Sequence, residues 1–337
     1  MTRKGRNSMS GKVSTIAVHG LMAALIVALP ATVQAQAGSE AWPSRAVRIV
    51  AGFPPGGSTD IIGRTAAQGL AEAFRQPFVV ENQPGASTAI AATAVARAAP
   101  DGYTLLVGVS STMTINPVLY PNLSYSPDRD LRPVTIMGSF PLILAVNPAL
   151  PVTTVRELID YSRRPEQQLN YSTASVAFQL ATEMFKQMSG ARLYHVPYKG
   201  SSQAMLAVLS GDVQAVILDG APLVPHMQSG RLRALAVTSA TRSPLYPMLP
   251  TVAESGVPDY QVELWIGLFA PARTPGEIVA KLQAEIARIM QRPEVREKFA
   301  RLGIEARGDS TEQTAAMIRA EAVRFAAIIR SAGIKPE

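Results

Sequence analysis

The chain has 337 residues, 47% of them hydrophobic, which is enough for one large or two medium domains. It has no cysteine, and the two histidines beyond the leader, His195 and His226, are too far apart for a zinc motif, so we expect no disulfide, thiolate catalysis, metal site or cofactor. The formal charge of +7 falls to +3 without the first 36 residues, which hold four basic and no acidic residues. This small excess is compatible with attraction of small anions and excludes a nucleic-acid-binding footprint.

The N-terminal segment has the pattern of a secretory signal peptide. Basic residues precede an almost wholly apolar stretch from Ile16 to Pro30, which is too short to span a bilayer well. Small residues follow, and we expect cleavage after Ala35 or Ala37. We therefore predict a signal peptide over residues 1–36 and a soluble mature protein in the periplasm, without a lipid anchor because no cysteine follows.

In the next segment, residues 49–60, the sequence IVAGFPPGGSTD predicts a strand, a tight loop and a helix. Gly56 and Gly57 can adopt positive φ and allow close approach of a ligand. Ser58 or Thr59 is expected to cap the helix, whose free first amides and positive dipole end suit an anion. No lysine follows the glycines, which argues against a nucleotide-binding P-loop. A plain strand–turn–helix connection is the alternative.

Apolar runs and helical periods alternate along the rest of the chain. Strands are predicted over 46–50, 78–81, 104–107, 169–172, 194–196, 214–218, 232–237 and 264–269. Helices are predicted between many of them, and three further helical segments start near residues 274, 293 and 310. Such a long alternation favours an α/β fold.

Four loops that follow predicted strands are rich in small polar residues. In open parallel sheets, ligands bind at the loops after the carboxyl ends of the strands. Hydroxyls and helix-N-terminal amides donate hydrogen bonds, as a carboxylate requires, so we expect one shared anion cleft. For each loop alone, capping of the next helix is the alternative. The loops contain the segment GFPPGGSTD, residues 52–60; Ser110, Ser111, Thr112 and Asn116; Ser172, Thr173 and Ser175; and Lys199, Gly200, Ser201 and Ser202.

Seven segments resemble the Bug-type extracytoplasmic solute receptors, the substrate-binding components of tripartite tricarboxylate transporters. They are WPSRAVRIVAGFPPGGSTD, VVENQPGAS, APDGYTLLVG, INPVLY, HVPYKGS, PTVAESGVPDY and GLFAPARTP, and the resemblance covers residues 42–335. It implies a two-lobed, type II-like periplasmic-binding-protein fold, each lobe a mainly parallel sheet flanked by helices. Lobe 1 would comprise residues 40–141 plus 262–337, and lobe 2 residues 142–261.

The resemblance also implies a function. Such a receptor is not an enzyme: it captures a small organic carboxylate by lobe closure and delivers it to an integral-membrane permease or to a sensor protein. We expect a monomer. Combining the resemblance with the loop pattern, we predict ligand contacts from Phe53, Gly57, Ser58, Thr59, Asp60, Ser110, Ser111, Thr112, Ser172, Thr173, Phe178, Gln179 and Asp219.

The second-lobe loop departs from the family pattern. The segment NYSTASVAFQLATEMFK is shorter, lacks the usual glycines and places Phe178 and Gln179 where Ser/Thr and His are common. Phe178 is either a stacking wall for an aromatic acid or the first core residue of a helix. Asp219 either accepts a hydrogen bond from an amino or hydroxyl group of the ligand or bonds the interlobe backbone.

The competing function is a secreted α/β hydrolase or transferase that uses Ser110 or His195. Ser110 lies in the segment GVSST, which lacks the final glycine of a nucleophile elbow, and no Asp and His follow in hydrolase order. His195 lies between apolar neighbours, which is typical of a structural strand residue.

Overall fold

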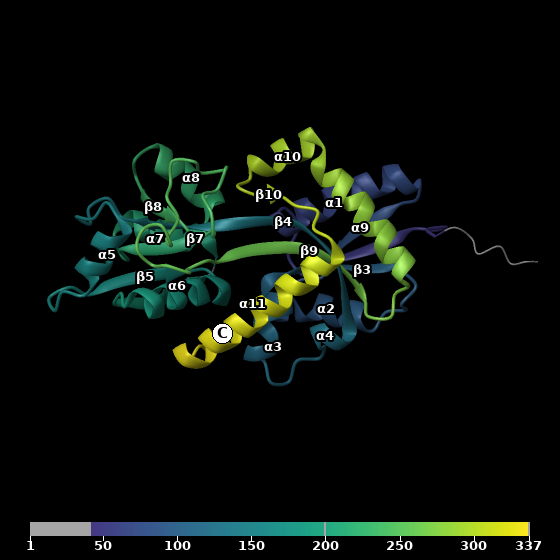
Figure 1. The fold of residues 1–337 in the computed structure, drawn as a ribbon, viewed down its shortest axis with the longest axis horizontal. Helices are drawn as coiled ribbons and strands as arrows, with labels where there is room; N and C mark the ends of the chain where they lie inside the picture. The colour runs from purple at the N-terminus through teal and green to yellow at the C-terminus, as the bar shows by residue number, and fades with distance from the viewer. Residues whose placement is uncertain (1–41, 199, 336–337) are drawn as a thin grey trace, which may run out of the picture. The chain divides into compact units, whose positions relative to one another are not determined.

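The computed structural model describes residues 42–198 and 200–335, so the predicted signal peptide lies outside the described residues. Strands and helices alternate as predicted (Figure 1). The strands are β1 (Val47–Ala51), β2 (Phe78–Asn82), β3 (Thr104–Val109), β4 (Leu131–Val146), β5 (Leu169–Thr173), β6 (Leu193–Pro197), β7 (Ala215–Asp219), β8 (Arg233–Val237), β9 (Glu263–Pro271) and β10 (Glu305–Ala306).

The helices follow the strands in the order expected of an α/β chain. They are α1 (Ser58–Phe74), the 3₁₀ turn η1 (Ala86–Thr88), α2 (Ala89–Ala96), the π-helical turn η2 (Ser111–Ile115), α3 (Asn116–Leu119), α4 (Pro127–Asp130), α5 (Val155–Ser162), α6 (Val176–Ser189), α7 (Ser201–Ser210), α8 (Gly220–Gln228), α9 (Gly276–Gln291), α10 (Pro293–Ala300) and α11 (Thr311–Ala332). None of the helices in the described part of the chain combines the length and the apolar character that crossing a membrane requires.

The described strands pair in the order β2-β1-β3-β9-β4-β7-β5-β6, with β8 and β10 also paired to β4. Pairing is parallel within β2–β1–β3 and within β7–β5–β6. The two connecting strands, β4 and β9, are antiparallel to each other and to β7 and β3 respectively. The prediction of mainly parallel sheets therefore holds for the two outer groups of strands, while the middle is antiparallel.

Strand β4 is not among the strands that the sequence pattern predicts. Its residues Leu131–Pro141 pair with β9, and its last residues, Leu142–Val146, pair with β7 and β8. Pro133, Pro141 and Gly138 interrupt its apolar pattern, and proline and glycine lower the strand signal of a segment. The pairing with β9 shifts register at two places, which lets the strand keep its partner despite these residues.

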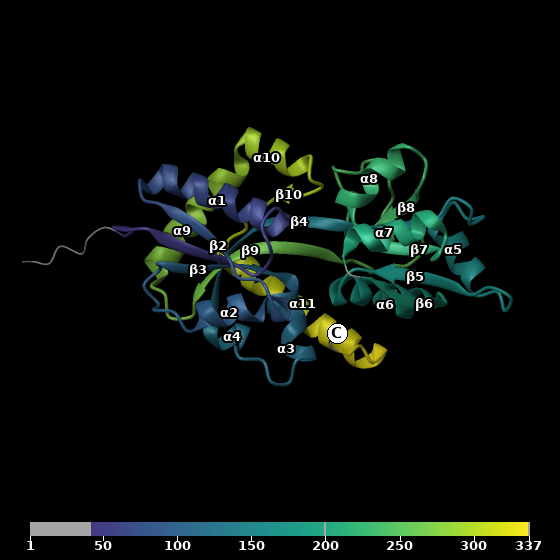
Figure 2. The ribbon, with the colours of Figure 1, turned by 180° about the vertical axis from the view of Figure 1, so that it is seen from behind.

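The hydrophobic residues form separate cores. Val47, Ile49 and Ala51 of β1 pack with α1 and α9, while Val50 packs with α2 on the other face. This alternation is the two-residue period of a strand covered on both faces, and Figure 2 shows α1 and α2 on opposite sides of these strands. A third and larger core is built mostly from residues 142–264.

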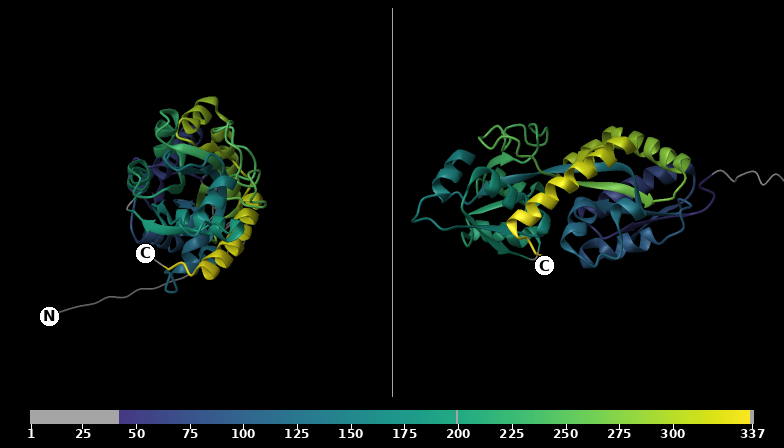
Figure 3. Two further views of the ribbon diagram at one scale, coloured as in Figure 1. Left: turned by 90° about the vertical axis from the view of Figure 1, so that its left-hand side faces the viewer. Right: turned by 60° about the horizontal axis from the view of Figure 1, so that its bottom comes forward.

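Helix α11 contributes to two of these cores. Ile318 belongs to the core beside α2, whereas Phe325 and Ile329 belong to the large core of residues 142–264. The helix packs against η2, β4 and α6 (Figure 3). It begins close to residue 310, as predicted, with a capping box in which Ser310 and Gln313 bond each other's backbone amides.

Candidate functional site

A cavity of about 260 Å³ lies where four helical N-termini meet. Each follows a strand: α1 after β1, η2 after β3, α6 after β5 and α7 after β6. Residues at or near the start of each helical segment line the cavity, together with residues of β4 and β9. The lining residues are Phe53, Ser58, Thr59, Val109, Ser110, Ser111, Phe140, Ala174, Ser175, Ala177, Phe178, Gly200, Ser201, Leu264, Trp265 and Ile266.

The electrostatic character of the cavity comes from backbone and hydroxyl groups. None of the described residues that line it is charged. The positive end of a helix dipole is equivalent to roughly half an elementary charge, and its free amides donate hydrogen bonds to an anion. Several such ends beside serine and threonine hydroxyls favour a small anion, while Phe140, Phe178 and Trp265 form an apolar part of the wall.

The glycine loop differs in detail from the expectation. Gly56 has φ +90° and uses the freedom of glycine, but Gly57 has φ −82°. The prediction that Ser58 or Thr59 caps α1 is wrong, because the N-cap is Gly57 and no side chain caps the helix. As the first residues of α1, Ser58 and Thr59 line the cavity instead.

Asp60 organises this loop from within. Its carboxylate accepts hydrogen bonds from the Gly56 amide at 3.0 Å, from Arg64 at 3.0 Å and from Asn82 at 2.9 Å. Although burial raises the pKa of Asp60, these hydrogen bonds outweigh it and hold the pKa below its ordinary value. The side chain does not line the cavity, and it closes the loop that presents Ser58.

The turn after β3 presents Ser110 and Ser111 to the cavity. Ser110, only 2% exposed, accepts a hydrogen bond from the backbone amide of Trp265 at 3.0 Å. Thr112 is directed elsewhere, since its hydroxyl lies 2.6 Å from that of Thr88. This region is a π-helical turn, a rare conformation that often occurs at functional sites.

The loop after β5 places its hydroxyls differently from the prediction. Ser172 donates to the carbonyl of Ala204 at 2.9 Å, and Thr173 lies 2.6 Å from Nε2 of His195. Neither lines the cavity, whereas Ser175, the N-cap of α6, does.

Phe178 lies on the first turn of α6, where it contributes to the core and also faces the cavity. It is 9% exposed and belongs to the large core, and it also lines the cavity. Gln179, the next residue, does not line the cavity.

Asp219 supports the cavity without lining it. Its carboxylate accepts a hydrogen bond of 2.7 Å from the hydroxyl of Ser201, which does line the cavity. Burial raises the pKa of Asp219 despite this hydrogen bond. This partner is neither of the two that the sequence left open.

The structure thus brings together six of the predicted residues around the cavity and leaves the others outside its lining. The six are Phe53, Ser58, Thr59, Ser110, Ser111 and Phe178; the residues outside the lining are Gly57, Asp60, Thr112, Ser172, Thr173, Gln179 and Asp219. Ser175 and Ser201 were visible as strand-end hydroxyls. Phe140 and Trp265 come from β4 and β9, where no motif marks a site.

The residues considered for catalysis occupy structural positions. The hydroxyl oxygen of Ser110 accepts from Trp265, and the ring of His195 packs on Tyr171 with centroids 5.2 Å apart and bonds Thr173. No three His, Asp or Glu side chains in residues 42–198 and 200–335 are grouped so that they could hold a metal ion.

The sequence profile of the tripartite tricarboxylate transporter family receptors matches residues 62–334. The chain belongs to this family. A curated relative, Protein BugT of Bordetella pertussis, is 35% identical over 308 residues, which is 90% of this chain and 94% of BugT. The family consists of binding receptors, so the chain is a receptor and not an enzyme.

Solved structures of related receptors have the same two-lobed fold. Rpa4515 of R. palustris, solved with adipate, is 36% identical with a TM-score of 0.76, and the alignment covers 88% of this chain and 100% of Rpa4515. MatC of Rhodopseudomonas palustris, solved with bound malate, is 32% identical with a TM-score of 0.71, covering 85% of this chain and 99% of MatC. Both relatives were solved with aliphatic dicarboxylic acids.

Proposed function

We propose that this chain is a periplasmic receptor that binds one small organic carboxylate in the 260 Å³ cavity and delivers it to an integral-membrane permease. The observation that carries the proposal is the meeting of four helical N-termini at a cavity with hydroxyls and no charged lining among the described residues. Such a site holds a carboxylate by several hydrogen bonds and partial positive charges. The adipate and malate bound by related receptors make aliphatic dicarboxylates the first ligands to test.

In this proposal, the ligand binds between two lobes, and the lobes close on the anion. Lobe 1 comprises residues 40–141 plus 262–337 and lobe 2 residues 142–261. Support comes from the separate cores and from the lining, since α1 and η2 belong to the first group of elements and α6 and α7 to the second. A ligand shifts such an equilibrium only by binding the closed state more tightly, and the closed state is then what the permease distinguishes.

A binding screen tests the ligand class. The mature chain, beginning near residue 37, is titrated with adipate, malate, citrate, benzoate and, as a matched neutral compound, adipamide. At a free concentration of about 100 times Kd, a ligand stabilises the folded state by about 2.7 kcal/mol, which thermal unfolding resolves. We expect a shift with at least one acid, none with adipamide, a stoichiometry of one by calorimetry and an unchanged ligand afterwards. Conversion of the acid would contradict the proposed function.

The partner and the compartment need separate experiments. Mass spectrometry of the protein from the periplasmic fraction should give a chain that begins at residue 36 or 38, after cleavage behind Ala35 or Ala37. Cells that lack the permease should lose uptake of the bound acid. Retained uptake together with loss of a transcriptional response would point to a sensor protein as the partner. Sedimentation is expected to give a monomer.

A further inference from the structure

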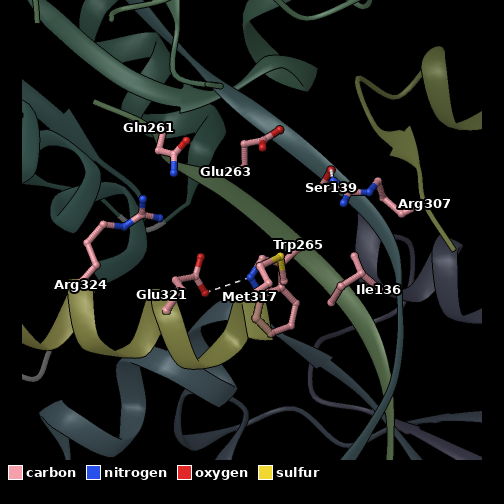
Figure 4. A pocket seen from close by; sticks show the side chains of 10 residues that line it. Ile136, Ser139, Gln261, Glu263, Trp265, Arg307, Met317, Glu321 and Arg324 are labelled. Carbon is pink, nitrogen blue, oxygen red and sulfur yellow. Dashed lines mark hydrogen bonds between the residues drawn. The ribbon is translucent and has the colours of Figure 1, made fainter. Parts of the chain in front are cut away.

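A second cavity, of about 340 Å³, lies between α11 and the paired strands β4 and β9 (Figure 4). Trp265 of β9 lines this cavity and also the carboxylate cavity described above, so its side chain and backbone separate the two. The second cavity contains the charged side chains Glu263, Arg307, Glu321 and Arg324, in contrast to the uncharged lining of the first.

Glu321 on α11 is the most deeply buried of these charged residues, with 5% of its surface exposed. Its Oε2 atom accepts a hydrogen bond from the indole Nε1 of Trp265 at 2.9 Å, drawn as a dashed line in Figure 4. The same oxygen lies 3.1 Å from Oγ1 of Thr114 in η2, which donates to it. One carboxylate oxygen therefore holds a strand residue and a turn residue at once.

These contacts are part of a closed ring of hydrogen bonds, and two residues of that ring line the carboxylate cavity. The backbone amide of Trp265 donates to Oγ of Ser110, and Oγ1 of Thr114 also lies within donating distance, 2.7 Å, of the Ser110 carbonyl. The single hydroxyl proton of Thr114 is thus shared between Ser110 and Glu321. Ser110 and Trp265 line the carboxylate cavity, while Glu321 reaches it only through them.

The charges around Glu321 come from three parts of the chain. Arg324 lies on the same helix, Glu263 on β9, and Arg307 follows β10 and is held by Asp309. Burial raises the pKa of Glu321 to about 7, although the bonds from Trp265 and Thr114 and the charge of Arg324 lower it. The negative charge of Glu263 also raises the pKa of Glu321, and so opposes the effect of Arg324.

We propose that Glu321 is a positioning residue for the carboxylate cavity, which fixes the indole of Trp265 and the turn Ser110–Ile115 and thereby sets the affinity for the ligand. This inference rests on the proposed function, because it assumes that the ligand occupies that cavity. A charged acceptor makes hydrogen bonds about twice as strong as a neutral one, so the wall is held most firmly when Glu321 is ionised.

The first test needs no ligand. Trp42 and Trp265 are the two tryptophans of the chain, so Trp42→Phe leaves Trp265 as the single indole reporter. Its fluorescence should titrate with a midpoint near the pKa of Glu321, about 7, and the titration should disappear in Glu321→Gln. Glu312→Gln, an exposed position on the same helix, is the matched control and should keep the titration. An identical titration with and without the carboxylate at position 321 overturns the proposal.

The second test measures adipate affinity by calorimetry between about pH 6 and about pH 8.5, where adipate stays ionised. The unmodified chain should bind about threefold to tenfold more tightly at the upper pH, and Glu321→Gln should bind with little pH dependence. Glu321→Ala should bind more weakly than Glu321→Gln at every pH, because it leaves the indole N–H without its acceptor. A pH-independent affinity in the unmodified chain overturns the proposal.

The two tests separate failure of this inference from failure of the proposed function. If the unmodified chain binds none of the acids in the screen, the proposed function is wrong. The inference then fails with it, even if the fluorescence of Trp265 titrates. If an acid binds with an affinity that Glu321→Gln leaves unchanged at all pH values, the proposed function stands and the positioning role of Glu321 does not.

Discussion

The hydroxyl of Thr238 accepts a hydrogen bond of 2.7 Å from the backbone amide of Leu142. The same hydroxyl donates to the carbonyl of Val262 at 2.6 Å, and the Thr238 side chain is fully buried. Leu142 and Val262 are the positions at which the chain is predicted to cross between lobes. The side chain of Thr238 therefore forms hydrogen bonds to both predicted crossing segments, and we expect the hinge between the lobes to lie near this residue.

Lobe closure on the ligand predicts a more compact protein. Small-angle scattering of the mature chain should give a smaller radius of gyration with saturating adipate than without it, because closure brings the lobes together. Adipamide serves as the control and should leave the curve unchanged. Superimposable curves with bound and free protein would argue for a preformed site.

Replacing Thr238 with valine should destabilise the protein, although the two side chains have nearly the same volume. The substitution leaves the buried Leu142 amide without its acceptor, which costs about 1–3 kcal/mol. Thr238→Ser keeps the hydroxyl and loses one methyl group, which costs about 0.8 kcal/mol. Urea unfolding measures both, and a valine variant no less stable than the serine variant would show that the hydroxyl is unimportant.

Gly57→Val should reduce carboxylate binding at least about tenfold while the fold survives, because the branched side chain would stand next to Ser58, which lines the cavity. The space around Gly57 is open, because a Cβ at this position would meet no atom within 4 Å, and its φ of −82° suits any residue. The helix should lose at most about 1 kcal/mol, because glycine provides no side-chain cap. Gly56→Val is the contrasting variant, since φ of +90° strains valine and should lower the melting temperature. Unchanged affinity in folded Gly57→Val would exclude the glycine loop from the site.

If Phe178 stacks on the ligand, the protein should bind aromatic or otherwise flat carboxylates modestly more tightly than aliphatic ones. A stacked ring adds about 0.5–1.5 kcal/mol beyond burial, which corresponds to roughly threefold to tenfold in affinity. Phe178→Leu retains an apolar side chain in the core and should weaken benzoate binding by that factor while sparing succinate. Equal losses for the two acids would mean that Phe178 only packs in the core to which it contributes.

Asp219 should make stability depend on pH. Burial raises the pKa of Asp219 above its ordinary value of 3.8, so ionisation costs folding free energy. The cost is absent below the unfolded-state pKa, near the ordinary value of 3.8. It grows as the pH rises from there to the folded-state pKa, and it is constant above that pKa. The melting temperature of Asp219→Asn should therefore be higher than that of the unmodified chain at about pH 7. At about pH 3.5 the two melting temperatures should be equal. Asp128→Asn, at an exposed position, is the control and should show no such difference.

The site was predictable where local sequence determines it. Strand ends followed by Ser58 or Ser110 mark the start of a helix, and those side chains do line the cavity. The bonds of Glu321 were not predictable, because they join it to Trp265 and Thr114, residues that are 56 and 207 positions away. The long strand β4 was missed because Pro133, Gly138 and Pro141 conceal it, although tertiary pairing with β9 overrides their weak propensity.

The shared helix α11 has a consequence for the order in which the protein folds. Phe325 and Ile329 complete the large core, and Ile318 completes the core beside α2, so both cores lack part of their apolar residues until the C-terminus has been synthesised. Contacts between distant parts of a chain also form slowly. A chain that ends before α11 would therefore lack apolar residues in two cores at once, so we expect C-terminal truncation to destabilise both cores together.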